Sequence, residues 1–160
     1  MPPADACSPD PEAPEAKRAA RFAVRTAADA RKALADLLTD SPHHTAGVLL
    51  DAQLAVTELV SNASRHAGGM TKFDACLDSR GTRLVIDVED ADPRHPVGEP
   101  LALRDPTAQG GRGWAMVLAL ACDSAIDPLP TGGKRIRITF VLRAEDSSET
   151  WAQPLPEAAE

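Results

Sequence analysis

The sequence lacks several features that would assign its 160 residues to common functional classes. No apolar run approaches the ~18 residues needed to cross a bilayer, and the first residues lack the apolar core of a signal peptide. The three cysteines, Cys7, Cys76 and Cys122, are odd in number and lack the spacing of metal ligands. We therefore expect reduced thiols, no membrane association and a cytoplasmic location.

Positive charge is also scarce. The formal net charge is −7, from 17 Lys and Arg against 24 Asp and Glu. Because binding to a nucleic-acid backbone requires a basic face, we expect no direct contact with nucleic acid. An acidic protein can still hold a polyanionic nucleotide, provided that magnesium and backbone amides supply a local positive field.

Large apolar residues are rare at both ends of the chain. Residues 1–17 are rich in proline, and residues 144–160 are acidic. Such segments bury too little apolar surface to offset the entropy lost on ordering, so we expect two disordered tails. One folded domain over residues 18–143 then remains, which is an ordinary size for a domain.

Hydrophobic periodicity predicts the elements of this domain. Helices are expected from Thr26 to about Thr39, over 46–67 and over 114–121, with Gly68 and Gly69 ending the second. A short strand is expected over 21–25, and two hairpins pair 72–79 with 82–90 and 124–126 with 135–142. The proline-rich loop 91–109 has the length of a lid. The sum is an α+β two-layer sandwich, with helices on one face of a mostly antiparallel mixed sheet.

The long helix carries polar residues opposite its apolar stripe. Glu58, Asn62 and His66 are four residues apart and project from nearly the same side. Glutamate can take a proton from a nucleophile, and an amide oxygen is a suitable hard ligand for magnesium. A solvated helix face is the alternative interpretation.

Asp90 shares the strand phase of Leu84, Ile86 and Val88, which places its carboxylate at the inward-facing end of a buried strand. A buried acceptor needs a donor, and an adenine amino group would serve. Alternatively, Asp90 lies just past the strand and caps a turn with Asp92-Pro93. The sequence leaves both interpretations open.

Gly111 and Gly113 open the third predicted helix, where unpaired amides and the helix dipole favour phosphate. No Lys-Ser or Lys-Thr follows at the spacing of a Walker loop, and no strand precedes as in a dinucleotide fingerprint. A plain junction between loop and helix is the alternative.

The order of these segments resembles the motif series of the GHKL ATPases, and within that superfamily the anti-sigma-factor serine/threonine kinases. The segments are ELVSNASRHA (58–67), VEDAD (88–92), GRGWAMV (111–117) and TGGK (131–134). The resemblance covers about Phe22 to Leu142 and implies a Bergerat-type ATP site.

The resemblance implies a role for each matching residue. Glu58 would be the catalytic base, Asn62 the magnesium ligand and Asp90 the reader of the adenine amino group. The other cofactor-binding residues that it implies are Arg65, His66, Asp92, Gly111, Arg112, Gly113 and Trp114. Members of the family phosphorylate a serine on a small antagonist protein and hold a sigma factor, and many are homodimers. We therefore expect ATP and Mg2+ as cofactors, and a sigma factor and an antagonist as partners.

Three residues depart from the family pattern. Asp92 and Arg94 stand where glycines are usual, and Lys134 stands where a threonine is often found. These departures keep open a second interpretation: a non-catalytic regulatory binding module with a structural or vestigial nucleotide site. A sensor histidine kinase domain is disfavoured, because no suitable helix carries a histidine before the domain. The lid arginine that would contact a partner is one of Arg94, Arg104 and Arg112.

Overall fold

The computed structural model describes residues 24–39, 41, 43, 45–98, 103–104 and 110–143. Within them, three helices and four strands follow one another as α1 (Ala27–Leu38), α2 (Ala46–Ala67), β1 (Met70–Leu77), β2 (Arg83–Asp90), α3 (Arg112–Leu120), β3 (Asp123–Pro128) and β4 (Lys134–Val141). The strands form one sheet in the order β1-β2-β4-β3, and every neighbouring pair is antiparallel. The predicted α+β fold is confirmed.

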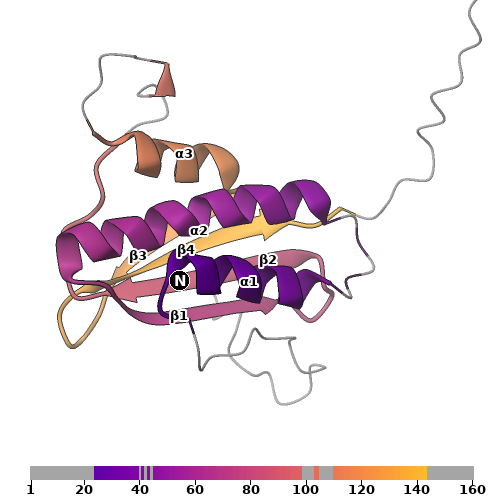
Figure 1. Cartoon of the computed structure of the whole chain (residues 1–160), viewed down its shortest axis with the longest axis horizontal. Helices are drawn as coiled ribbons and strands as arrows, with labels where there is room; N and C mark the ends of the chain where they lie inside the picture. Colours follow the sequence, from indigo (N-terminus) through magenta and orange to yellow (C-terminus); the bar gives the residue numbers. More distant parts are fainter. Residues whose placement is uncertain are drawn as a thin grey trace, which may run out of the picture.

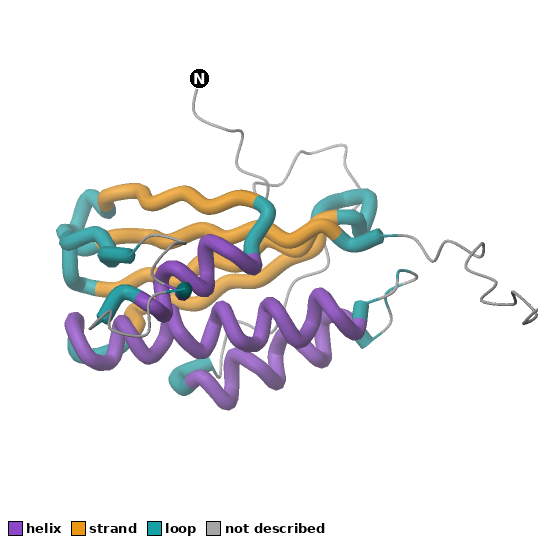
Figure 2. Tube along the Cα trace, turned by 90° about the horizontal axis from the view of Figure 1, so that it is seen from above, coloured by secondary structure: helices purple, strands orange, loops and turns teal. Residues whose placement is uncertain are grey.

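The helices form a layer on one side of the sheet, as Figures 1 and 2 show. In Figure 1, α1 and α2 lie along the strands, and α3 lies against α2 on the side away from α1. The core fills the space between the layers, and its largest fully buried side chains include Leu34, Val56, Leu59, Leu84, Ile86 and Ile138. The helical and strand periodicities therefore supply the two sides of a single core.

The ends of the first two helices follow from their sequence. The Asp29 backbone N–H donates to Thr26 Oγ1 at 3.1 Å, and the Thr26 N–H donates to Asp29 Oδ2 at 3.0 Å. This capping box satisfies amides that the first turn leaves without acceptors. Helix α2 has the predicted bounds and ends at Gly68, as expected.

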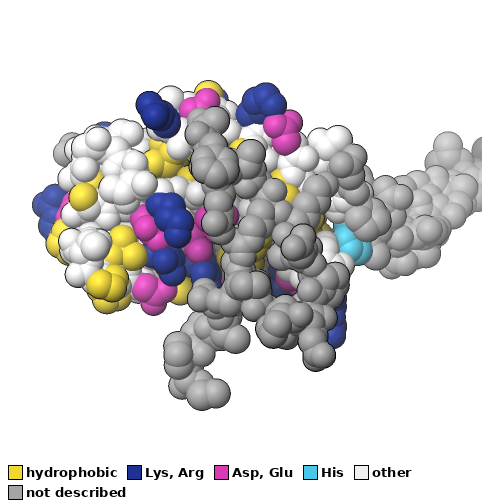
Figure 3. Space-filling view, turned by 90° about the horizontal axis from the view of Figure 1, so that it is seen from below, with side chains coloured by type: hydrophobic (Ala, Val, Ile, Leu, Met, Phe, Trp, Pro, Cys, Tyr) yellow, Lys and Arg dark blue, Asp and Glu magenta, His cyan; other side chains and the backbone are white. Residues whose placement is uncertain are grey.

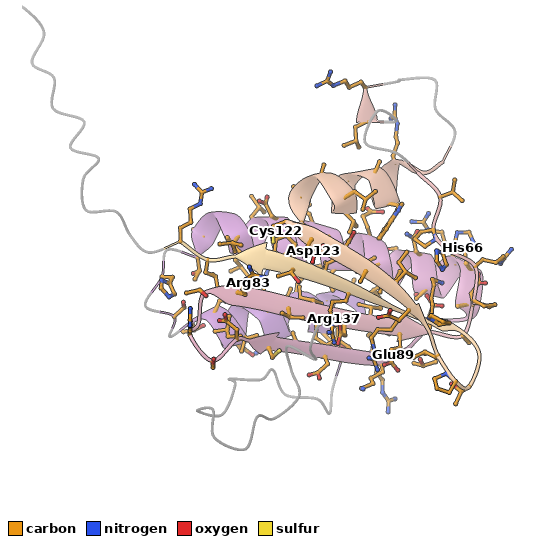
Figure 4. The ribbon with its side chains drawn as sticks, turned by 180° about the vertical axis from the view of Figure 1, so that it is seen from behind. His66, Arg83, Glu89, Cys122, Asp123 and Arg137 are labelled. Carbon is orange, nitrogen blue, oxygen red and sulfur yellow. The ribbon has the colours of Figure 1, made fainter. Side chains whose placement is uncertain are left out.

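Strand register decides which charges face the helices. Along β2 and β4 the inward residues pair directly across the sheet, as Leu84 with Phe140 and Ile86 with Ile138, and this row ends with Asp90 opposite Lys134. The other face carries ion pairs: Asp87 with Arg137 and Glu89 with Arg135, each with a closest distance of 2.8 Å. Figure 4 shows Glu89 and Arg137 on this face. Acidic and basic side chains also lie close together in the view of Figure 3.

Some sequence expectations meet a limit or a correction. Residues 21–23 of the expected first strand, and both expected tails, lie outside the described residues, while Val24 and Arg25 belong to no strand. The expectation of reduced thiols is wrong for Cys76, which is disulfide-bonded. The alternating sequence pattern places Cys76 on a strand, but it does not show whether the thiol forms a disulfide. Cys122 is an exposed free thiol.

The remaining differences concern the bounds of elements. Helix α3 begins at Arg112, two residues before the predicted start, and β3 extends to Pro128. Cross-strand pairing with β4 recruits residues into β3 whose own pattern is weak. No helix in the described ranges is long and apolar enough to cross a membrane.

Candidate functional site

A cavity of about 650 Å³ lies where α2, the end of β2, the following loop, the start of α3 and the start of β4 meet. The structure brings all ten predicted site residues to its wall: Glu58, Asn62, Arg65, His66, Asp90, Asp92, Gly111, Arg112, Gly113 and Trp114. They come from segments up to 56 positions apart along the chain (58 to 114). The convergence makes one site out of motifs that are individually unspecific.

Helix α2 forms the wall that carries Glu58 and Asn62. Both side chains are half-buried and line the cavity, and neither makes a hydrogen bond to the described part of the protein. His66 follows near the end of the helix, where Figure 4 shows it. The carboxylate and the carboxamide are therefore available to a ligand from successive turns of one rigid element.

Asp90 lines the cavity and is 4% exposed. Lys134 Nζ donates to Asp90 Oδ1 at 2.8 Å, and the Asp92 backbone N–H donates to the same oxygen at 2.9 Å. The carboxylate is therefore inward-facing, and the alternative that Asp90 lies past the strand is wrong, because Asp90 is the last residue of β2. Its carboxylate nevertheless caps the following turn through the Asp92 N–H. The donor that its burial requires is a lysine of the same chain.

Asp92 adds no unpaired negative charge to the site. Arg94 donates to both of its carboxylate oxygens, with Nε and Nη2 each 2.9 Å from an oxygen. This pairing, together with the Arg94 backbone N–H, lowers the pKa of Asp92 to about 2. No non-glycine residue in the described ranges has a positive φ, so a side chain at position 92 is compatible with its backbone.

The start of α3 presents backbone amides to the cavity. Gly111 is the N-cap, and the first helical bond to it comes from the Ala115 N–H. The amides of Arg112, Gly113 and Trp114 therefore have no acceptor within the helix. A Cβ at position 113 would overlap Glu58 Oε2, so glycine there lets the helix start approach the carboxylate.

The loop between β2 and α3 contributes residues that the sequence did not reveal. His95, Pro96 and Val97 line the cavity, as do Gly110 and Ile136. The backbone at Gly98 lies against the backbone at Gly111, so closely that a Cβ on Gly98 would overlap the Gly111 carbonyl. Only the length and the proline content indicated a special loop, and no local pattern predicts which of its residues line the cavity.

Lys134 is the most consequential residue absent from the predicted set. The sequence identified it only as a departure from a family pattern. Its strand phase matches Ile136 and Ile138, which could have revealed it as an inward-facing cation. It is 6% exposed and lines the cavity beside Asp90.

The cavity differs in charge from the whole chain. Its wall carries four Lys and Arg (Arg65, Arg94, Arg112 and Lys134) against three carboxylates (Glu58, Asp90 and Asp92). The chain as a whole has a net charge of −7. A local excess of positive charge in an acidic protein favours an anionic ligand at this place.

Comparison with known proteins agrees with this geometry. A search of curated proteins found no match to the chain. A family model described as a histidine kinase-like ATPase domain matches residues 11–140, which include every residue named above as lining the cavity. The match covers most of the sequence and supports both the GHKL superfamily and ATP binding. The chain therefore belongs to the family of histidine kinase-like ATPase domains.

Proposed function

We propose that the chain binds magnesium-ATP in this cavity and transfers the γ-phosphoryl group to a serine of a small antagonist protein. The same protein would hold a sigma factor through a separate surface and act as a homodimer. The observation that carries the proposal is the position of Glu58 and Asn62 on successive turns of α2, in the wall of the same cavity that the start of α3 lines.

The cavity suits a nucleoside triphosphate. Its volume of about 650 Å³ lies within the usual range for small-molecule sites. The phosphates would lie at the start of α3, where Arg112 and three backbone amides supply positive potential. The base would lie beside Asp90.

Asn62 suits a magnesium ion that arrives with its nucleotide. Magnesium is held by few protein oxygens and keeps its water and phosphate ligands. The Asn62 carboxamide oxygen lines the cavity and accepts no hydrogen bond from the described residues. One neutral oxygen on a rigid helix is therefore sufficient on the protein side.

Glu58 would act as the general base. Bound magnesium-ATP supplies the electrophilic γ-phosphorus; the serine oxygen bonds to it, the bond to the β-phosphate oxygen breaks, and ADP leaves. Glu58 accepts the proton of the serine hydroxyl at Oε1 or Oε2, neither of which is bonded to another described residue. The carboxylate lies close to the start of α3, since a Cβ on Gly113 would overlap Glu58 Oε2.

The variant Glu58→Gln tests this function, because it keeps the size of the side chain and removes the base. We expect binding of magnesium-ATP to persist while transfer of labelled phosphate to antagonist proteins of the same genome falls by roughly 10²- to 10⁴-fold. Asn62→Ala is expected to weaken binding itself. Undiminished phosphorylation by Glu58→Gln would refute the assigned role.

One observation favours the non-catalytic alternative. Asp90 Oδ1 already accepts two hydrogen bonds from the chain, so part of the base site is satisfied without a ligand. In this case the protein would be a regulatory binding module. A melting temperature that magnesium-ATP leaves unchanged would support that function, since a ligand specific for the native state must raise it.

A further inference from the structure

We propose that Lys134 is a specificity-determining residue, whose ammonium donates directly to the N1 ring nitrogen of adenine while Asp90 accepts from the adjacent amino group. This inference rests on the proposed nucleotide binding and adds a second reader of the base. The two side chains form a buried ion pair in the wall of the cavity, with exposed fractions of 7% for Lys134 and 5% for Asp90.

One N–H of the Lys134 ammonium and one oxygen of the Asp90 carboxylate make no hydrogen bond to a described residue. An ammonium has three N–H donors, and Lys134 Nζ uses two of them, for Asp90 Oδ1 and for the Asp92 carbonyl, each at 2.8 Å. Among the described residues, the two groups that donate to the Asp90 carboxylate both donate to Oδ1. In the described ranges no group donates to Asp90 Oδ2. This oxygen is also not one of the fully buried polar atoms that lack a hydrogen-bond partner. Oδ2 and the third N–H of Lys134 therefore remain for a ligand.

Two features hold Lys134 in this position. Gly133 lies against the Asp90 carbonyl so closely that a Cβ would overlap it, and its φ of 86° is readily adopted only by glycine. Arg94 occupies the Asp92 carboxylate, while the Lys134 ammonium bonds the Asp92 backbone carbonyl. The ammonium is thus fixed by two acceptors before any ligand binds, so little conformational entropy remains to be lost on binding.

The acceptor Asp90 Oδ2 and the third N–H of Lys134 complement adenine. The Watson–Crick edge of adenine places an amino donor beside the N1 acceptor, which complements an acceptor beside a donor. A lysine donates only, whereas a water molecule or a hydroxyl at the same place could donate or accept. Guanine, with a carbonyl beside a protonated N1, could pair only in a shifted position, with its amino group facing no further acceptor from this pair. The pair therefore favours adenine.

The experiment compares nucleotides that differ only in the base. Dissociation constants are measured by calorimetry on the full chain, with magnesium present, for ATP, for 1-deaza-ATP, in which C–H replaces N1, and for GTP. A third analogue, 7-deaza-ATP, changes a ring atom that the proposal does not use. The wild type should bind ATP about 10- to 100-fold more tightly than 1-deaza-ATP, because the analogue leaves a charged donor unpaired. It should bind 7-deaza-ATP about as tightly as ATP.

Protein variants assign the difference to Lys134. Lys134→Met and Lys134→Thr should lose most of the preference for ATP over 1-deaza-ATP. Thr provides a second variant, since its hydroxyl can still donate to Asp90 if Met does not fold. Arg135→Met is the matched control, because Arg135 pairs with Glu89 on the other face of the sheet and should retain the preference.

The outcomes separate this inference from the proposed function. Tight binding of ATP with equal affinity for 1-deaza-ATP, or a preference that survives both Lys134 variants, would overturn the role of Lys134 and leave nucleotide binding intact. Tighter binding of GTP than of ATP would overturn the assignment to adenine. Absence of binding to every nucleotide would instead refute the proposed function and, with it, this inference.

Discussion

Asp90 on β2 and Lys134 on β4 are direct partners across the sheet, and their side chains form a buried ion pair with 2.8 Å between Oδ1 and Nζ. The pair closes a row of apolar contacts that includes Val88 opposite Ile136. Charges removed from water depend on each other, because each would otherwise be buried without compensation. The same contact therefore bears on stability and on recognition of the base.

Lys134→Met should lower the free energy of unfolding by about 3 kcal/mol, near the lower end for breaking a buried pair, because the cavity lets some solvent reach Asp90. Arg135→Met is the control, since its pair with Glu89 is more exposed and should be worth less than about 1 kcal/mol. Urea unfolding of both variants measures the difference. Equal losses would show that the Asp90–Lys134 pair behaves as a surface pair.

The double variant Lys134→Met/Asp90→Asn should recover part of this loss, because it removes the carboxylate charge that the single variant leaves unpaired. The same urea curves, with Asp90→Asn completing the cycle, give the coupling energy as the difference between the loss of the double variant and the sum of the two single losses. Strict additivity of the two single losses would contradict the coupling that the 2.8 Å contact indicates.

The sequence predicted the helices better than it predicted this contact. Helix α2 has the expected bounds because periodicity and a terminal glycine are local signals. Strand phase likewise showed that Asp90 faces inward. Its partner depends on the register between β2 and β4, which joins residues 44 positions apart and is fixed by the whole sheet. Phase can be read locally, whereas register cannot.

The same limit applies to the site. Glu58, Asn62 and Asp90 were identified because each residue type is chemically informative on its element. His95, Pro96 and Val97 line the cavity from a loop whose two ends meet at Gly98 and Gly111, and no pattern of side chains records this contact between backbones.

Gly113→Ala should impair the site more than the fold. Alanine favours a helix by about 1 kcal/mol over glycine, but here its Cβ would displace the Glu58 carboxylate. We expect phosphate transfer to fall at least about 10-fold, as for the loss of a positioned base. Gly47→Ala is the control, because this glycine of α2 has open space around it and the variant should gain stability and keep activity. Equal activity of the two variants would show that the Glu58 position is not limiting.

Asn62→Ala should reduce the rise in melting temperature that ATP produces with magnesium, and should have little effect on the smaller rise with ATP and EDTA. The reason is that the variant removes one oxygen ligand of the metal and no contact to the base. Ser64→Ala is the matched control on the same helix, since the Ser64 hydroxyl donates to the Val60 carbonyl and does not line the cavity. Equal losses with and without magnesium would remove Asn62 from the metal site.

The pair of Arg94 and Asp92 should make stability depend on acid. Arg94 lowers the pKa of Asp92 from 3.8 to about 2, so the folded state binds its proton less readily than the unfolded chain. The resulting stabilisation is complete above the unfolded pKa and is lost as the pH falls through the folded pKa. Arg94→Gln should therefore lower the free energy of unfolding at about pH 6 and have a much smaller effect near pH 2.

Arg104→Gln supplies the control, because it removes the same charge from an exposed arginine that does not line the cavity. Urea unfolding at the two pH values gives, for each variant, the change in the free energy of unfolding relative to the wild type. Only the change for Arg94→Gln near pH 6 should be large. The Arg94 backbone N–H still donates to Asp92 in the variant, so the pKa of Asp92 should rise only part of the way to its ordinary value. A penalty for Arg94→Gln that is independent of pH would mean that Arg94 stabilises the loop by packing, and that the Asp92 charge contributes nothing to it.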